Sequence, residues 1–250
     1  MFKKLIIATL FVASSIYAGS INIAVAANVS YAIDEIKKEF NKLYPKTEVR
    51  VTLGSSGKLT AQIKNGAPYQ LFMAANMKYP KALYEDDIAI TRPLIYAQGG
   101  LAMLSDSQKD FSKGINLVND SSIEKIAVAN PKTAPYGKAS VEAMKNAGVV
   151  LAEAKKKFVY GESVSQTVSY AVTASDMGFV AKSSLYSPKM SEYKKGTHWI
   201  EIDSKLYTPI NQGIVVLKNG KNNSEVAAFY AFMLSSKAKK IMEKFGYIVP

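Results

Sequence analysis

The chain has 250 residues, 48% of them hydrophobic, no cysteine and a formal net charge of +12. Disulfides, thiol nucleophiles and zinc–thiolate sites are therefore excluded, and the length allows one large domain or two lobes of roughly a hundred residues each. The charge comes from lysines spread along predicted helices, with Arg50 and Arg92 as the only arginines. This pattern indicates solvated helix faces and attraction for anions, and no nucleic-acid-binding motif accompanies it.

The N-terminus has the layout of a secretory signal peptide. Lys3 and Lys4 precede an apolar run over residues 5–13, and small residues follow around Ala18. The run is too short to cross a bilayer as a helix, and no cysteine follows it that could carry a lipid anchor. The sequence therefore predicts a signal peptide over residues 1–20, cleaved after Ala18 or after Ser20, and a periplasmic protein.

Strand and helix signals alternate through the next eighty residues. An apolar run at 21–26 predicts a buried strand, and an amphipathic helix follows from Asn28 and ends before Pro45. The next predicted elements are a strand at 48–53, a tight loop at 54–57, a helix through Ile63 and a strand at 71–75. This repetition predicts a mostly parallel sheet with helices on both faces.

The same alternation restarts after Ala97 and returns near the C-terminus. The predicted strands lie at 101–104, 126–129, 158–160, 178–180 and 213–217, and the predicted helices at 135–148, from Ser163 onward, and twice within 224–244. A restart without a linker predicts an α/β protein of two lobes joined by crossovers near 91–99 and 201–209. Lobe one is expected over 21–97 plus 204–250, and lobe two over 98–203.

No arrangement of residues predicts catalysis or a bound metal cation. His198 is the only histidine, which excludes metal clusters built on His or Cys spacing. No G-x-S-x-G motif is present, and the loop from Gly54 to Gly57 is too short for a Walker A loop. We therefore predict no enzyme activity, no metal ligands and no cofactor.

Four loops that lead from a strand into a helix carry small or hydroxyl-bearing residues. They lie at 26–28, 54–57, 134–137 and 161–164. Free N–H groups and the positive end of the helix dipole make such a position suitable for an anion. The alternative is ordinary N-capping, in which Asn28, Ser56 and Ser163 satisfy their own helices. Ligands of open α/β sheets bind at the carboxyl ends of strands, so two facing lobes would bring the four loops to one cleft.

The chain resembles the molybdate-binding proteins of bacterial molybdate ABC importers over essentially its whole mature length. The matching stretches are Ala-Val-Ala-Ala-Asn at 24–28, Gly-Ser-Ser-Gly-Lys-Leu at 54–59, Gln-Ile-Lys-Asn-Gly-Ala-Pro at 62–68 with Leu-Phe-Met-Ala-Ala-Asn at 71–76, Ala-Asn-Pro-Lys-Thr-Ala-Pro-Tyr-Gly at 129–137, Gly-Phe-Val at 178–180 and Phe-Gly-Tyr-Ile at 245–248. The resemblance implies a type II periplasmic binding protein, monomeric, that delivers molybdate or tungstate to the membrane permease of an ABC importer.

The resemblance also implies a set of ligand-binding residues that hold the anion with neutral donors. Ser56 matches a hydroxyl donor, and Asn28 stands where the family usually has Ser. Main-chain donors are matched by Ala75, Tyr136 and Val164. Where the family commonly adds a Tyr hydroxyl, this chain has Ala181. The family's usual Asp pair around the third strand is replaced by Gln70 and Asn76.

The chemistry of the anion agrees with such a site. Molybdate is a dianion near neutral pH and fits a pocket of donors, whereas phosphate keeps a proton that would need an acceptor. Sulphate would have to be rejected by size, and tungstate would bind like molybdate. The remaining alternatives are a binder of another oxyanion on the same fold, a secreted hydrolase that uses Ser56, and a surface adhesin.

Overall fold

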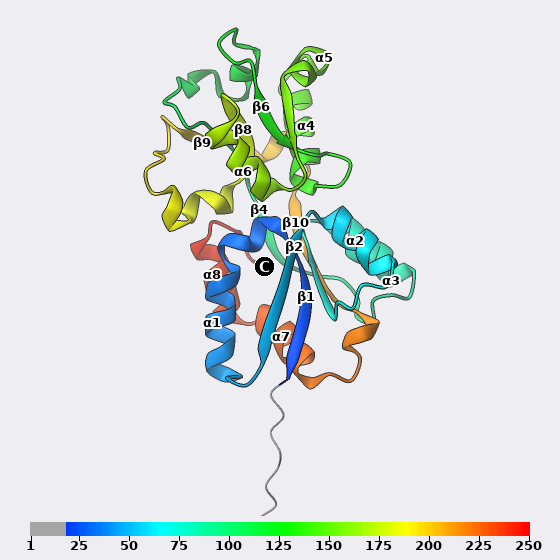
Figure 1. The fold of residues 1–250 in the computed structure, drawn as a ribbon. Coiled ribbons are helices and arrows are strands. Elements are labelled where there is room, and N and C mark those ends of the chain that lie inside the picture. Colours follow the sequence, from blue (N-terminus) through cyan, green and yellow to red (C-terminus); the bar gives the residue numbers. More distant parts are fainter. Residues whose placement is uncertain (1–18) are drawn as a thin grey trace, which may run out of the picture.

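The structure is a computed structural model that describes residues 19–250. The predicted signal peptide lies outside the described residues, apart from Gly19 and Ser20. Two five-stranded sheets organise the chain, with strand orders β2-β1-β3-β10-β4 and β7-β6-β8-β5-β9. Each sheet mixes parallel and antiparallel pairs and is covered by helices, so the predicted α/β architecture of two lobes is confirmed (Figure 1).

The first sheet builds what we call the first lobe. Its strands are β1 (Ser20–Ala26), β2 (Glu48–Gly54), β3 (Leu71–Ala74), β4 (Leu94–Gly99) and β10 (Ile210–Val216). β1 pairs in parallel with β2 and β3, whereas β10 runs antiparallel to β3 and β4. The three parallel strands therefore end at the same edge of the sheet, which faces the rest of the molecule (Figure 1).

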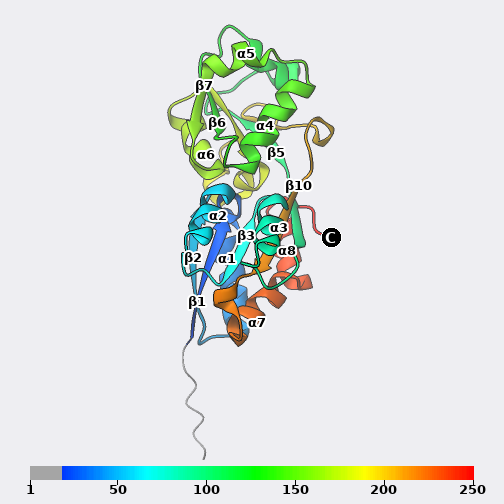
Figure 2. The same cartoon turned by 90° about the vertical axis from the view of Figure 1, so that its right-hand side faces the viewer.

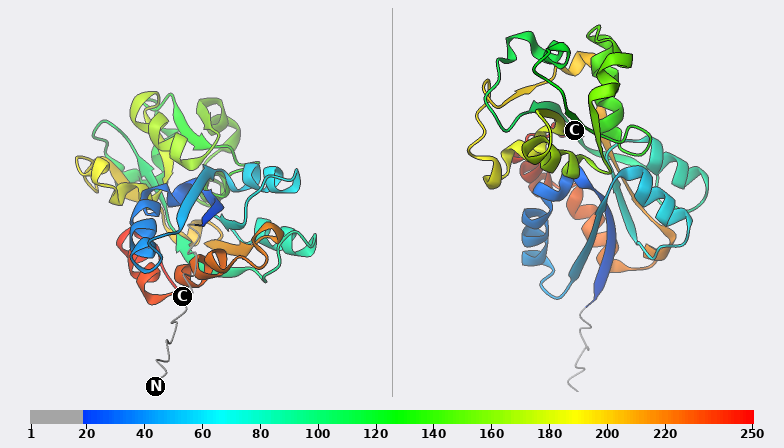
Figure 3. Two further views of the ribbon diagram at one scale, coloured as in Figure 1. Left: turned by 60° about the horizontal axis from the view of Figure 1, so that its bottom comes forward. Right: turned by 45° about the horizontal axis from the view of Figure 1, so that its top comes forward.

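Alternating side chains divide this sheet into two buried faces. Ile21, Ile23 and Val25 point to one face, where they pack with α1 (Ile33–Leu43), α7 (Ser224–Met233) and α8 (Ser236–Lys244). Ala24 and its neighbours point to the other face and pack with α2 (Ser56–Lys64) and α3 (Lys78–Glu85). Figure 3 shows these helices on either side of the sheet.

Aromatic packing fixes the first of these helices. Phe40 of α1 is fully buried between Phe229 and Phe232 of α7, with ring centroids 5.0 and 5.6 Å away. Leu43, at the end of the predicted apolar stripe, is instead 61% exposed because the helix ends there. Between β1 and α1 the chain forms a single 3-10 turn, η1 (Ala27–Tyr31), where the sequence predicted the start of the helix itself.

The second sheet builds the second lobe. Its strands are β5 (Leu101–Leu104), β6 (Ile126–Ala129), β7 (Phe158–Gly161), β8 (Met177–Ala181) and β9 (Trp199–Glu201). Its α-helices are α4 (Pro135–Asn146), α5 (Leu151–Ala154) and α6 (Val164–Thr173). Its 3-10 helices are η2 (Phe111–Asn119), η3 (Lys155–Lys157), η4 (Lys182–Tyr186) and η5 (Pro188–Met190). α4 packs on one face through Tyr136, Ala139 and Ala143, and α6 packs on the other through Val168 and Ala171. None of the helices in residues 19–250 has the length and hydrophobicity that a bilayer crossing needs.

The chain crosses between the sheets twice. It leaves the first sheet between Gly99 and Leu101, and it returns between β9 and β10 through the short turn η6 (Ser204–Leu206); η7 (Lys218–Gly220) follows β10. The predicted boundary at 97/98 falls inside β4, and the one at 203/204 falls before β10. Figure 2 shows the two lobes stacked along these connections.

Among the α-helices and strands of the structure, α3, α5, β4 and β9 had no counterpart among the predicted elements. β4 lies at the edge of its sheet, and its first two residues, Leu94 and Ile95, are 44% and 39% exposed. Its last residue, Gly99, passes so close to Tyr136 that a Cβ atom there would lie 2.0 Å from the tyrosine hydroxyl. The connection between the lobes therefore accepts only glycine at this position.

Candidate functional site

A small pocket lies between the lobes where the carboxyl ends of their parallel strands meet. The empty space among its lining atoms is about 190 Å³, part of it open to solvent. The residues that line it come from β1 and η1, from the loop between β2 and α2, from the end of β3, and from the first turns of α4 and α6: Ala26, Ala27, Asn28, Gly54, Ser55, Ser56, Ala75, Ala134, Pro135, Tyr136 and Val164. So small a pocket excludes a large organic ligand.

Ser56, the first residue of α2, presents its side chain to this pocket. Its Oγ accepts a hydrogen bond of 2.9 Å from the backbone N–H of Ala75. The hydroxyl proton is therefore free to point elsewhere, because an Oγ that accepts one bond can still donate another. Ser56 is fully buried, so only a partner inside the pocket can take that proton.

Asn28 lines the same pocket, but its carboxamide is bound to the protein. Its Nδ2 donates to Gln212 Oε1 at 2.9 Å and to Tyr247 Oη at 2.8 Å. Both amide hydrogens are used in these bonds, and Asn28 is only 1% exposed. The side chain of Asn28 is thus occupied as a donor, which leaves its backbone N–H as the group that can serve the pocket.

The second lobe contributes the first turns of two helices. The backbone amides of Tyr136 and Val164 occupy the second position of α4 and the first position of α6, where a helix offers no internal acceptor. In residues 19–250 neither amide, nor that of Ser56, donates to a backbone carbonyl outside its helix. These helix N-termini present unpaired N–H groups and the positive end of a dipole to the pocket.

Side-chain capping is present at only one of the predicted loops. Ser163 Oγ accepts from the N–H of Gln166 at 3.3 Å, so this serine caps α6. Asn28 and Ser56 make no such bond to their own helices, and α4 begins at Ala134 and Pro135 without a side-chain cap. Ordinary N-capping therefore explains Ser163 and does not explain the other positions.

Tyr136 fills the hinge side of the pocket with its ring. Burial raises the pKa of Tyr136 well above its ordinary value, the neighbouring tyrosines Tyr247, Tyr207 and Tyr96 raise it further, and the Asn28 side chain lowers it. The Tyr136 hydroxyl and Asn28 Oδ1 are both buried, and neither completes a hydrogen bond with another described residue. Tyr136 therefore stays protonated.

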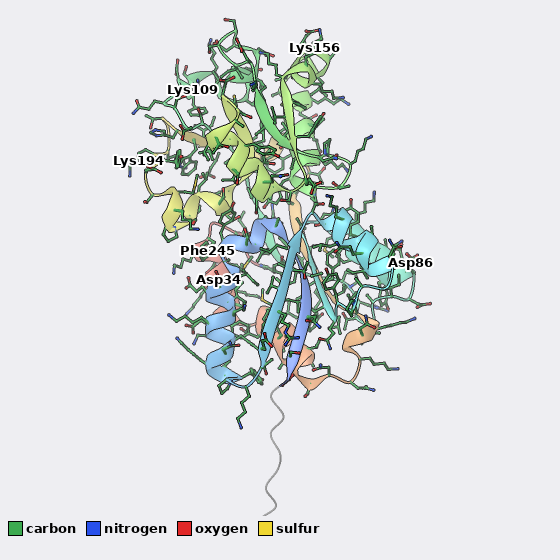
Figure 4. The ribbon with its side chains drawn as sticks, viewed as in Figure 1. Asp34, Asp86, Lys109, Lys156, Lys194 and Phe245 are labelled. Carbon is green, nitrogen blue, oxygen red and sulfur yellow. The ribbon has the colours of Figure 1, made fainter. Side chains whose placement is uncertain are left out.

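The residues that line the pocket carry no formal charge. Figure 4 shows labelled charged side chains, such as Lys109, Lys156 and Asp86, at the periphery of the lobes. No group of three or more His, Cys, Asp or Glu side chains that could hold a metal ion occurs in residues 19–250. The pocket can therefore bind through neutral hydrogen-bond donors and helix dipoles.

Direct contacts join the two lobes around the pocket. The N–H of Gly57 donates to the carbonyl of Thr133 at 2.9 Å. Lys58 Nζ lies 2.6 Å from Glu162 Oε2, with both side chains about half exposed or more. A Cβ atom on Gly57 would lie 2.9 Å from Thr133 O and 2.7 Å from the Tyr79 hydroxyl, so the close approach of the lobes requires glycine here.

Five of the six predicted binding residues line the pocket: Asn28, Ser56, Ala75, Tyr136 and Val164. Ala181 does not; it ends β8 fully buried, and its carbonyl accepts from Ser184 Oγ. The N–H of Ala75 is already bound to Ser56 Oγ, so it supports the serine in this conformation. The sequence analysis did not select Ser55, whose buried Oγ has no partner among the described residues.

Comparison with known proteins finds relatives that match along both lobes. The family model described as bacterial extracellular solute-binding protein matches residues 21–248. The molybdate-binding protein ModA of Rhodobacter capsulatus is 35% identical, with 92% of this chain and 89% of that protein covered. ModA of Azotobacter vinelandii is 32% identical, with 92% and 90% covered. The structure of the periplasmic molybdate-binding protein of Azotobacter vinelandii aligns with a TM-score of 0.84 at 28% identity, covering 92% of this chain and 99% of that one.

Proposed function

Because the chain belongs to the bacterial extracellular solute-binding proteins, and among them to the family of the ModA molybdate-binding proteins, we propose that its pocket binds molybdate or tungstate. The bound anion would be delivered to the membrane permease of an ABC importer, and the protein would act as a monomer on the outer side of the cytoplasmic membrane. The family is one of binding proteins, so the protein is not an enzyme.

The observation that carries this proposal is the chemistry of the pocket lining. Unpaired amides at the starts of α2, α4 and α6, together with the hydroxyl of Ser56, converge on a pocket of about 190 Å³ without a charged side chain. A small dianion can accept hydrogen bonds on every oxygen, and bonds to a charged acceptor are the strong ones. The site thus matches an oxyanion, which carries negative charge and accepts hydrogen bonds from neutral donors.

The same lining disfavours phosphate. Hydrogen phosphate carries a proton that binds most strongly to a carboxylate acceptor, and no Asp or Glu lines the pocket. The unpaired Asn28 Oδ1 is a neutral amide acceptor, which binds such a proton less strongly than a carboxylate does. Sulphate has the same hydrogen-bonding character as molybdate and differs in size, so its rejection depends on how tightly the lobes close.

Closure of the two lobes provides the mechanism. Most residues that line the pocket are buried, so the anion enters when the lobes separate and is enclosed when they meet. The two crossings beside β4 and β10 are the connections about which this motion turns. Binding the anion through donors of both lobes would shift the equilibrium toward the closed form that docks on the permease.

Titration calorimetry on the protein purified from its extracytoplasmic fraction tests this function. We expect one-to-one binding of molybdate and of tungstate with similar affinity, and no heat of binding with phosphate or sulphate. Preference for sulphate or phosphate would favour a different oxyanion on the same fold. The absence of a heat of binding with any of the four anions would refute the proposal.

A further inference from the structure

We propose that Ser183 of the second lobe and Tyr247 of the first lobe form a buried clasp on Asn28 that holds the lobes closed without touching the anion. Both would be positioning residues, because neither lines the pocket. The inference rests on the proposed function, since its main measurement is the retention of bound molybdate.

The clasp consists of hydrogen bonds around the carbonyl oxygen of Asn28. Ser183 Oγ donates to this oxygen at 2.9 Å, and Tyr247 Oη lies at the same distance from it. Tyr247 Oη is also 3.2 Å from Ser183 Oγ and accepts from Asn28 Nδ2. Tyr247 has one proton, so it donates either to the carbonyl or to the serine, and both arrangements leave every group paired.

All three members of the clasp are shielded from water. Asn28, Ser183 and Tyr247 are 1%, 3% and 4% exposed. Gln212 of β10, which accepts from Asn28 Nδ2, is fully buried as well. Hydrogen bonds in such surroundings are stronger than at the surface, and removing one partner leaves a buried group unsatisfied.

Only part of this network depends on closure. The bonds among Asn28, Tyr247 and Gln212 lie within the first lobe and can persist when the lobes separate. The bonds that Ser183 makes to Asn28 and Tyr247 cross between the lobes, because Ser183 belongs to η4 directly after β8. Ser183 therefore stabilises the closed form selectively.

The turn that receives the clasp also carries part of the pocket. η1 presents Ala27 and Asn28 to the pocket, and the carbonyls of the same two residues accept hydroxyls of the second lobe. Ser165 Oγ of α6 donates to Ala27 O at 2.7 Å and lies 3.1 Å from Ser30 Oγ. The second lobe thus donates hydrogen bonds to the carbonyls of Ala27 and Asn28, and the same two residues line the pocket. Closure is therefore linked to the position of the pocket donors on η1.

The test compares Ser183→Ala with Ser184→Ala. Ser184 is fully buried like its neighbour, but its hydroxyl donates to Ala181 O within the second lobe at 2.7 Å. Dissociation of radiolabelled molybdate is followed after a chase with unlabelled molybdate. We expect Ser183→Ala to dissociate about two- to tenfold faster than the wild type, because one or two buried hydrogen bonds of the closed form are lost. Ser184→Ala should unfold at a lower temperature and dissociate at the wild-type rate.

Tyr247→Phe adds a double-mutant cycle. It removes the hydroxyl that contacts Ser183, so the effects of the two substitutions on the dissociation rate should combine to less than their product. In Ser183→Ala the order of affinities among molybdate, tungstate and sulphate should stay that of the wild type, since no pocket donor changes. An unchanged rate in Ser183→Ala, or an equal acceleration in Ser184→Ala, would overturn the clasp.

A failure of the proposed function would look different. If the wild type bound no oxyanion, the clasp could still be measured by small-angle X-ray scattering of the ligand-free proteins. Ser183→Ala should then have a larger radius of gyration than the wild type and Ser184→Ala. Equal radii in all three proteins, at the value calculated from the closed structure, would refute the clasp.

Discussion

Ser56 and Asn28 follow neighbouring strands of one sheet and line one pocket, but their side chains serve different purposes. The Ser56 hydroxyl is anchored by the N–H of Ala75 and keeps its proton for the pocket. The Asn28 carboxamide is turned toward Gln212 and Tyr247, behind the pocket. Equivalent positions in the sheet therefore do not imply equivalent chemistry, because a longer side chain can reach partners that a serine cannot.

Ser56→Ala tests the pocket side of this comparison and should have the largest effect. It removes a donor to a charged ligand and also the acceptor of the Ala75 N–H. We expect the affinity for molybdate to fall about ten- to a hundredfold by calorimetry, since hydrogen bonds to charged groups are worth about 1.5–3 kcal/mol. Affinity within twofold of the wild type would exclude Ser56 from the site.

Gly57→Ala, one residue further along, separates closure from folding. The new methyl group would meet Thr133 of the opposite lobe, so closure should be impeded and molybdate affinity should fall about tenfold. When the lobes are apart, the first turn of α2 can accept alanine once the Tyr79 hydroxyl of the same lobe moves aside, so the free energy of unfolding of the ligand-free protein should change by less than about 0.5 kcal/mol. Denaturant unfolding and calorimetry measure the two effects, and a joint loss of stability and affinity would argue against this explanation.

Asn28→Ser shortens this side chain and tests the other side of the comparison. If the carboxamide acts as a support, serine should leave Gln212 and Tyr247 without their donor and destabilise the protein by about 1–3 kcal/mol. Molybdate affinity should drop about three- to tenfold. If the Asn28→Ser variant bound molybdate as tightly as the wild type and kept its stability, the side chain at this position would serve the ligand and not the fold.

Lys58→Gln should have the smallest effect, because it breaks an ion pair between lobes that is exposed to solvent. Such pairs contribute about 0.2–1 kcal/mol, so molybdate should dissociate about twofold faster at low ionic strength. The difference should shrink near 1 M salt, where the Debye length falls to about 3 Å, close to the separation of this pair. An effect larger than that of Ser183→Ala would place the main contact between the lobes at this edge.

The repeating pattern of apolar runs and small-residue loops was sufficient to predict most of the fold. β1, β2 and β3 lie where alternating or continuous apolar residues predicted strands, and the two helices predicted within 224–244 are α7 and α8. β9 has three residues, and β4 begins exposed at the edge of its sheet, so neither leaves a periodic signal. The segment that forms β4 was therefore predicted to be a crossover between the lobes.

The location of the site was predictable, but the direction of its side chains was not. The carboxyl ends of parallel strands, with helices beginning after them, brought five of the six selected residues to one pocket. The partners of the Asn28 carboxamide lie 184 and 219 residues away, at positions that carry no local signal of a contact. Ser183 and Tyr247 could be connected to Asn28 only after the two lobes were seen together.

The neutral lining of the pocket has a consequence for unloading. Among the residues that enclose it, Tyr136 has the only side chain that can lose or gain a proton in an accessible range, and burial raises the pKa of Tyr136 well above its ordinary value. Acidification from neutral pH therefore changes no charge in the pocket wall. The wall of this pocket is insensitive to the acidity of its surroundings, and release of the anion depends on separation of the two lobes.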